Sequence, residues 1–253
     1  MDGQFITDRG QMRSTNEDSG GIFFNESGQA LAIVADGMGG HQAGEVASQL
    51  AVSIVQDKWE QSNRFSTPIE AEEWLQAAVE EMNKMIYKRS LEHEEFEGMG
   101  TTVVISICTF DFVTIAHIGD SRCYLLNDTK LEQLTEDHSL VNELIRTGQI
   151  SKVDAEQHPR KNVLLRAVGT EESVNMDMET INWDENNCLL LCSDGLTNKI
   201  PDDEIETYLR TKENLEEVSN KLIQVANERG GEDNITLAII RNVLEDEVGE
   251  TTC

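Results

Sequence analysis

Short runs of apolar residues, several of them rich in β-branched side chains, recur along the chain and are closed by turn-forming residues. Runs of this kind, about four to eight residues long, are typical of buried strands. We therefore expect strands at residues 3–8, 20–25, 30–36, 102–108, 112–118, 122–126, 188–193 and 235–240.

Other stretches keep their apolar residues at helical spacing. They predict helices over 41–61, 68–90, 202–210 and 214–229. Strands thus come in consecutive groups and helices in consecutive pairs, which is not the strict alternation of a doubly wound parallel sheet. This order favours an α+β fold in which antiparallel sheets are covered by helical hairpins.

The length of 253 residues suits one large domain or two small ones. No linker rich in proline, glycine or serine divides the chain, so we expect one domain over residues 1–243. The remaining stretch, 244–253, is acidic with few apolar residues, and we expect it to be a frayed tail.

One segment, residues 137–168, differs in charge from the rest of the chain. It carries five basic residues against four acidic ones, a balance of +1 in a chain of net charge −28. A locally basic and mostly irregular excursion between strands indicates a surface flap. An ordinary solvated insertion is the alternative, and the sequence leaves both open.

The overall charge limits the partners. Twenty basic and 48 acidic residues argue against nucleic acid and anionic membranes. No apolar run is long enough to span a membrane, and the N-terminus does not have the pattern of a signal peptide. The five cysteines, an odd number without a Cys-x-x-Cys pair, indicate free thiols in a reducing compartment, so we expect a cytoplasmic protein.

Two of the apolar runs end in the same way, LAIVADGMGG (31–40) and CLLLCSDGLT (188–197). Each stops at an Asp-Gly pair, which places Asp36 and Asp194 at the end of a buried strand. The glycine that follows allows the backbone to approach a ligand closely. Further acidic residues lie beside other strands: Glu17, Asp18, Asp120 and Asp233.

Any one of these residues alone would be an ordinary turn residue or helix cap. Their recurrence at strand ends is what favours a shared site, because several converging carboxylates repel one another unless cations neutralise them. An all-oxygen site favours Mg²⁺ or Mn²⁺, and no histidine or cysteine cluster has the spacing of zinc ligands.

Two phosphate-binding loops can be weighed against this interpretation. The glycines after Asp36 follow a strand and open a helix, as in a dinucleotide-binding turn. The third small residue of that pattern is replaced by Gln42, and Asp36 would face the pyrophosphate, so this reading is poor. A P-loop is excluded because the chain has no Gly-Lys dipeptide.

Eight sequence blocks now point to a family: RSTNED, VADGMGGH, GMGTT, HIGDSR, LTEDHS, LLRAVG, LLLCSDGLT and GGEDNIT. In this order they resemble metal-dependent Ser/Thr protein phosphatases of the 2C type, especially the compact bacterial members. The resemblance runs from about residue 4 to 241. It implies a four-layer α-β-β-α sandwich, which agrees with the grouping of strands and helices above.

The resemblance also implies roles for the acidic residues. Asp36 would bridge two metal ions, Mn²⁺ or Mg²⁺, and the carbonyl of Gly37 would bind one of them. Asp194 and Asp233 would hold the other ion. The acidic pair Glu17 and Asp18 would act mainly through metal-bound waters, and Asp120 would bind a third, weaker ion.

For the reaction, the resemblance implies direct attack on phosphoserine or phosphothreonine by a metal-bridging hydroxide. Asp36 and Arg13 would be the catalytic residues, with the guanidinium of Arg13 gripping the substrate phosphate. No phosphoenzyme is required. Consistently, no cysteine begins the Cys-x5-Arg loop of the covalent phosphatases.

The leaving-group acid departs from the pattern of the animal-type members, which carry a histidine directly after the Asp-Gly pair. This chain has Met38 there. His41, three residues on, and a metal-bound water are both candidate proton donors, and the sequence does not decide between them.

Two functions remain after the sequence alone. The first is a protein phosphatase acting on phosphorylated proteins, among them the substrates of a bacterial Ser/Thr kinase and the kinase itself, and expected to be a monomer. The alternative is a metal-free, inactive relative that serves as a binding or regulatory module. Such a relative is expected to have lost metal ligands, and none of the ligand positions is missing here.

Overall fold

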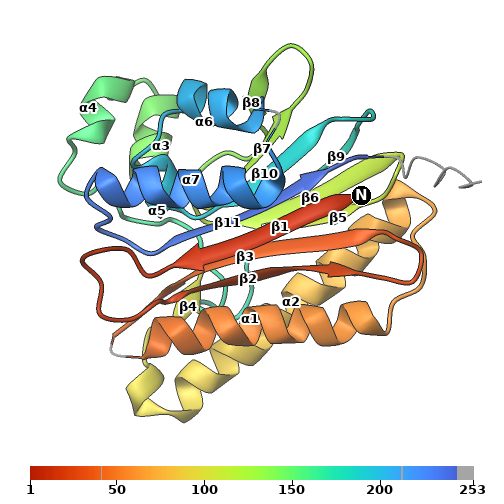
Figure 1. The fold of residues 1–253 in the computed structure, drawn as a ribbon. Coiled ribbons are helices and arrows are strands. Elements are labelled where there is room, and N and C mark those ends of the chain that lie inside the picture. The colour runs from red at the N-terminus through yellow and green to blue at the C-terminus, as the bar shows by residue number, and fades with distance from the viewer. Residues whose placement is uncertain (41, 212, 244–253) are drawn as a thin grey trace, which may run out of the picture.

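The computed structural model describes residues 1–40, 42–211 and 213–243. Its centre is formed by two stacked antiparallel sheets (Figure 1). The first contains, in spatial order, β1 (Asp2–Asp8), β11 (Ile235–Arg241), β10 (Cys188–Cys192), β7 (Arg122–Leu126) and β8 (Leu131–Gln133). The second contains β2 (Asp18–Phe24), β3 (Ala30–Met38), β5 (Val103–Cys108), β6 (Phe112–Ile118) and β9 (Asp177–Asn182), with β4 (Gly100–Thr101) paired to β3.

Helices cover the outer face of each sheet (Figure 1). The long pair α1 (Ala43–Glu60) and α2 (Pro68–Glu92) packs on the second sheet, and the short helix η1 (Glu94–Phe96) follows it. The short helix α5 (Asp194–Thr197) and the pair α6 (Asp202–Leu209) and α7 (Leu215–Glu228) pack on the first. These four layers confirm the α+β sandwich with helical hairpins.

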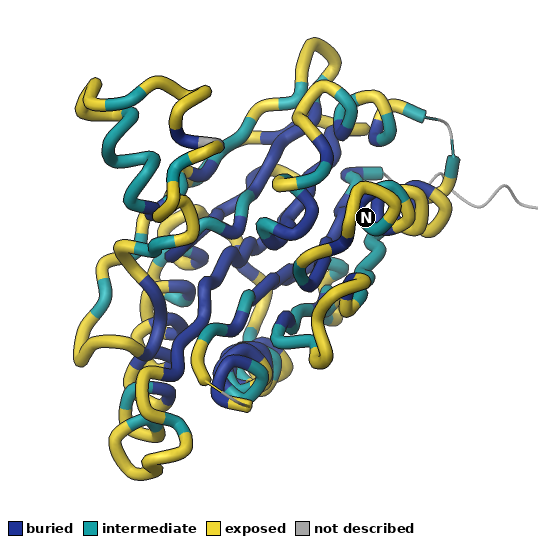
Figure 2. The backbone as a smooth tube through the Cα atoms, turned by 90° about the vertical axis from the view of Figure 1, so that its left-hand side faces the viewer, coloured by how far each residue is buried: buried dark blue, intermediate teal, exposed yellow. Residues whose placement is uncertain are grey.

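The continuous apolarity of the central strands follows from this layering. Along β3, Leu31 and Ile33 face the core under α1 and α2, whereas Ala32 and Val34 face the core between the sheets. Because successive side chains of a strand point to opposite faces, a strand buried on both faces has no polar alternation. Figure 2 shows the result: the residues of the central strands are buried, whereas most residues of the loops are exposed.

All eight predicted strands and four predicted helices are present, with ends shifted by a few residues. The strands β4, β8 and β9 were not predicted, because β4 and β8 are very short and β9 is a half-exposed edge strand with a polar sequence. The flap is interrupted by two short helices that the sequence did not predict. It contains α3 (Leu140–Arg146) and α4 (Lys152–Glu156), which begin after the capping hydroxyls of Ser139 and Ser151.

The four cysteines in the described part of the chain are free and buried. Burial raises the pKa of Cys108, Cys188 and Cys192 to about 12, and it raises the pKa of Cys123 well above its usual value. The fifth, Cys253, and the predicted acidic tail lie outside the described residues. Among the helices that the structure describes, none has the length and apolarity needed to cross a membrane.

Candidate metal centre

Asp18 and Asp36 lie opposite each other on neighbouring strands. Asp18 begins β2, Asp36 lies near the end of β3, and the antiparallel register pairs the two residues directly. Directly opposed side chains share one face of a sheet. Because Val34 and Ala32 on the same face of β3 line the core between the sheets, both carboxylates face the inter-sheet space at its end.

The first sheet brings Asp194 and Asp233 to the same end. Asp194 follows β10 and begins α5, while Asp233 lies two residues before β11, the neighbour of β10. Asp120 follows β6 in the turn to β7. Burial raises the pKa of Asp36 well above its usual value, and repulsion by the other four aspartates raises it further. The structure therefore brings together the five aspartates that the sequence predicted.

The other buried carboxylates are perturbed in the same direction. Burial, as the largest cause, raises the pKa of Asp18 and of Asp120 to about 7 and that of Asp194 to about 6. Repulsion by neighbouring aspartates adds to each increase. The cluster thus holds protons that isolated carboxylates would lose, and a divalent cation would take their place by neutralising the same charges.

In two of these carboxylates, Asp18 and Asp194, one oxygen accepts a hydrogen bond from a neighbouring side chain. The backbone N–H of Thr236 donates to Ser193 Oγ at 3.0 Å, so the hydroxyl proton of Ser193 is left to donate to Asp18 Oδ2, at 2.7 Å. Similarly, Asn198 Nδ2 donates to Asp194 Oδ2 at 2.9 Å. The second oxygen, Oδ1, of both aspartates is buried and has no hydrogen-bond partner among the described residues.

This pattern fits a hard divalent cation. A buried oxygen without a hydrogen bond costs free energy unless something else binds it. Here two such oxygens, one from each sheet, lie in a cluster of carboxylates, and their side chains are oriented by neighbouring donors. Oxygen donors of this kind suit Mg²⁺ or Mn²⁺. Metal-binding carboxylates are typically oriented by a hydrogen bond to their other oxygen, as Asp18 and Asp194 are here.

Arg13 lies at the rim of the cluster. Its Nη2 donates to Asp233 Oδ2 at 2.8 Å, its Nε donates to the carbonyl of Glu232 at 3.3 Å, and Nη1 lies 3.9 Å from Glu17 Oε2. The side chain is 46% exposed, so the guanidinium faces both the aspartates and the solvent. Glu17 is half-buried behind it, and burial raises its pKa.

Glycine is required after Asp36 and after Asp194 for a steric reason. A Cβ on Gly37 would lie 2.0 Å from the carbonyl oxygen of Gly44 in α1, and one on Gly195 would lie 1.9 Å from that of Asn234. The missing side chains admit the backbone of another segment, which packs against each strand end and fixes the neighbouring aspartate. The close approach of the glycine backbone to a ligand stays a prediction.

Sequence reasoning missed the residues that orient the aspartates. Beside Ser193 and Asn198 these include Thr102, whose Oγ1 accepts from the N–H of Asp36 at 3.0 Å and shares a hydrogen bond of 2.7 Å with Ser121 Oγ. Thr102 therefore connects the strand of Asp36 to the turn of Asp120. Ser193 and Ser121 adjoin Asp194 and Asp120 in the sequence, but Thr102 lies far from Asp36, so no local signal marks these roles.

The remaining candidate, His41, lies outside the described residues. Its role as leaving-group acid therefore stays a prediction.

The fold and this cluster define a class of protein. The family model for protein phosphatase 2C matches residues 9–238, and the chain belongs to this family. It is 49% identical to serine/threonine phosphatase Stp of Listeria welshimeri, over 97% of this chain and 98% of that protein. It is 38% identical to protein phosphatase PhpP of Streptococcus pneumoniae, over 97% of this chain and 99% of that protein.

Solved structures agree with this assignment. The serine/threonine phosphatase Stp1 from Staphylococcus aureus is 39% identical, with a TM-score of 0.89 over 94% of both chains. The catalytic domain of the phosphatase PstP, in complex with two manganese ions, is 33% identical, with a TM-score of 0.83 over 94% of this chain and 96% of that one.

Proposed function

We propose that this chain is a metal-dependent phosphatase that hydrolyses phosphoserine and phosphothreonine in proteins. One observation carries the proposal: carboxylates from both sheets converge, and Asp18 and Asp194 each keep one buried oxygen that no described residue hydrogen-bonds. Membership of the protein phosphatase 2C family and the names of the relatives support the same activity.

In this proposal the chain's own oxygens hold two divalent cations, Mn²⁺ or Mg²⁺, and a third, weaker one. The ligands would be Asp18, Asp36, the carbonyl of Gly37, Asp194 and Asp233, with Asp120 for the third ion and Glu17 acting through water. When bound, the cations would supply a nucleophile from water at neutral pH and stabilise negative charge on the phosphate. Ser193, Asn198 and Thr102 would keep the carboxylates oriented.

Arg13 would bind the substrate phosphate. A guanidinium matches phosphate oxygens with paired donors, and that of Arg13 is half-exposed at the rim of the cluster. Its contacts with Asp233 and Glu17 support a position between the acidic ligands and the entering substrate. The arginine would orient the phosphate and stabilise its charge during in-line attack.

The flap would contact the peptide around the phosphorylated residue. Lys152, Arg160 and Lys161 are exposed on it. Lys199 in first place, and Lys161 more weakly, lower the pKa of Glu232, which is the neighbour of Asp233. Lys161 thus acts on Glu232 only through its charge, whereas Lys199 forms the ion pair with Glu232.

Further parts of the proposal rest on the family resemblance. Residues 1–243 would form a single catalytic domain that acts as a monomer in the cytoplasm. Its partners would be phosphorylated proteins, including a Ser/Thr kinase and the substrates of that kinase.

The proposal is tested by hydrolysis of a phosphothreonine peptide with Mn²⁺, with EDTA, and with the variant Asp36→Asn in Mn²⁺. We expect activity only for the unmodified chain with Mn²⁺. The variant should remain folded, because it loses a buried charge that its neighbours repel. Near-normal turnover by Asp36→Asn, or full activity in EDTA, would refute the assignment. Inactivity of folded protein that takes up no Mn²⁺ in calorimetry would favour the metal-free binding module.

A further inference from the structure

Three side chains from separate parts of the chain meet where the flap joins the sandwich. His138 lies at the start of the flap, Arg166 near its end, and Asp177 begins β9. Arg166 Nη1 donates to Asp177 Oδ1 at 2.7 Å, and His138 Nε2 lies 3.2 Å from Asp177 Oδ2. One carboxylate on the sheet therefore contacts both ends of the flap.

The two ends of the flap are also paired with each other. The N–H of Leu165 donates to the carbonyl of His138, and the N–H of Leu140 donates to that of Val163, both at 2.8 Å. The flap thus has a short stem of two paired segments. Asp177 lies outside this stem and ties it to β9.

His138 connects the stem to the turn that carries Asp120. Its backbone N–H donates to the carbonyl of Gly119 at 2.9 Å, and the N–H of Gly119 donates to His138 Nδ1 at 3.1 Å. Because Nδ1 accepts, the ring proton is on Nε2 and is donated to Asp177, and Arg166 Nη1, 3.1 Å from Nε2, then contacts the ring without a hydrogen bond. Burial, and then the neighbouring His117, lower the pKa of His138, which keeps the ring neutral.

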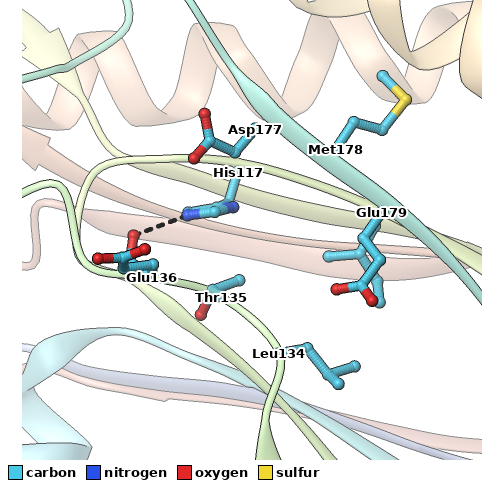
Figure 3. A pocket seen from close by; sticks show the side chains of 8 residues that line it. His117, Leu134, Thr135, Glu136, Asp177, Met178 and Glu179 are labelled. Atoms are coloured by element: carbon cyan, nitrogen blue, oxygen red, sulfur yellow. Dashed lines mark hydrogen bonds between the residues drawn. The ribbon is translucent and has the colours of Figure 1, made fainter.

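A metal ion is the alternative explanation of this cluster, since one ligand atom each from His117, His138 and Asp177 lie within 4.8 Å of one another. The hydrogen bonds argue against it. His138 has no free lone pair, because Nδ1 accepts from Gly119 and Nε2 is protonated. His117 Nε2 donates to the carbonyl of Glu136 at 2.9 Å (Figure 3), and Arg166 already neutralises Asp177.

The contact with Arg166 stabilises the charged form of Asp177. Partial burial alone would raise the pKa of Asp177, yet hydrogen bonds from Arg166 and His138 lower it below its usual value. Asp177 also lines a pocket of about 200 Å³ with Glu136 and Glu179 (Figure 3), so two further carboxylates lie near it. Loss of Arg166 would leave this acidic edge without that partner.

We propose that Asp177 is a positioning residue that fixes the flap stem against β9 and thereby sets how tightly a phosphopeptide binds. A stem released from β9 would let the flap pivot and would displace its exposed basic side chains, Lys152, Arg160 and Lys161. The effect on peptide binding rests on the proposed phosphatase function. The anchoring of the stem does not.

The test uses Asp177→Asn in the full chain. Asparagine keeps the shape and one acceptor for His138 but loses the charge opposite Arg166. We expect backbone amides in residues 140–165 to exchange with deuterium about fivefold faster, since exchange reports local opening. With Mn²⁺, KM for a phosphothreonine peptide should rise about fivefold, while kcat and KM for a small aryl phosphate stay within about twofold.

Glu204→Gln is a matched control, because it removes an ion pair with Arg229 of similar exposure, 40% and 39% against 49% and 40% for Asp177 and Arg166. It should leave flap exchange and both substrates unchanged. Arg166→Gln removes the same contact from the other side and should reproduce the effects of Asp177→Asn. If Asp177→Asn fails to fold, Arg166→Gln tests the anchoring instead.

Unchanged flap exchange in the folded variants would overturn the anchoring. Faster exchange with equal effects on both substrates would overturn the role in peptide binding. If the unmodified chain hydrolyses neither substrate, the proposed function fails, whereas the exchange rates still decide whether Asp177 anchors the stem.

Discussion

Substitution of Ser193 by alanine should weaken metal binding although Ser193 is no expected ligand. Its hydroxyl accepts from the N–H of Thr236 and donates to Asp18 Oδ2 in a fully buried position. The variant would lose a hydrogen bond to a carboxylate, roughly 1.5–3 kcal/mol, and leave the buried N–H of Thr236 unpaired. We expect unfolding to become easier by about 3 kcal/mol, which lowers Tm by roughly 6–12 °C in a domain of this size.

The effect on metal affinity has a separate cause. The hydrogen bond from Ser193 lowers the pKa of Asp18, against the larger effect of burial. Without it, protons compete more strongly with a cation for Asp18, and the carboxylate is less well oriented. Loss of such a supporting hydrogen bond typically costs about 10–100-fold in metal affinity.

The assay is calorimetric titration of Mn²⁺ into metal-stripped protein at pH 7.5, with Tm measured in EDTA. Ser219→Ala is a suitable control, because Ser219 is equally buried but bonds only to the carbonyl of Glu216 within α7. The control should keep the Mn²⁺ affinity of the unmodified chain. If Ser193→Ala keeps it as well, or if both variants lose it equally, the reasoning is wrong.

Four further predictions follow from the same geometry. In EDTA the free energy of unfolding should fall as pH rises from about 4 to about 7. The reason is that three aspartates bind protons more tightly in the folded chain than in the unfolded one: Asp18 and Asp120, with pKa about 7, and Asp194, with pKa about 6. Urea midpoints that rise across this range would contradict the prediction. Gly195→Ala should destabilise the fold by about 1–3 kcal/mol, since its Cβ would meet the carbonyl of Asn234. Gly40→Ala is the control, because its Cβ would meet no atom of the described residues within 4 Å, and equal urea midpoints would refute the steric argument. Arg13→Ala should raise KM about tenfold or more in steady-state kinetics with Mn²⁺, as expected for a lost charged hydrogen bond; an unchanged KM would place the phosphate grip elsewhere. Neutralising Lys152, Arg160 and Lys161 together should alter kcat/KM for phosphopeptides more than for a small aryl phosphate, and equal effects would count against contact between flap and peptide.

The sequence predicted the parts of the fold in which local pattern and burial agree. β10, and β3 as far as Ala35, are apolar because both of their faces are covered. β9 was missed because an edge strand needs no such pattern, and Asp177 and Glu179 lie exposed on it. Its place was set by pairing with β6, which the segment itself does not encode locally.

The candidate site divides in the same way. Asp36 and Asp194 could be predicted, since a carboxylate directly after a buried strand stands out in the sequence. Ser193 could not, because its role depends on Asp18, which is 175 residues away, and on the N–H of Thr236. A serine before an aspartate is ordinary, and only the stacking of the two sheets gives it a function.

The buried cysteines have a consequence for oxidative stress. Hydrogen peroxide attacks thiolates, and burial keeps the four described thiols protonated at neutral pH. A phosphatase whose nucleophile is a cysteine is silenced by the same oxidant. Dephosphorylation that relies on carboxylates and cations would instead continue through a burst of peroxide, so serine and threonine signals could still be reset after a thiol enzyme had stopped.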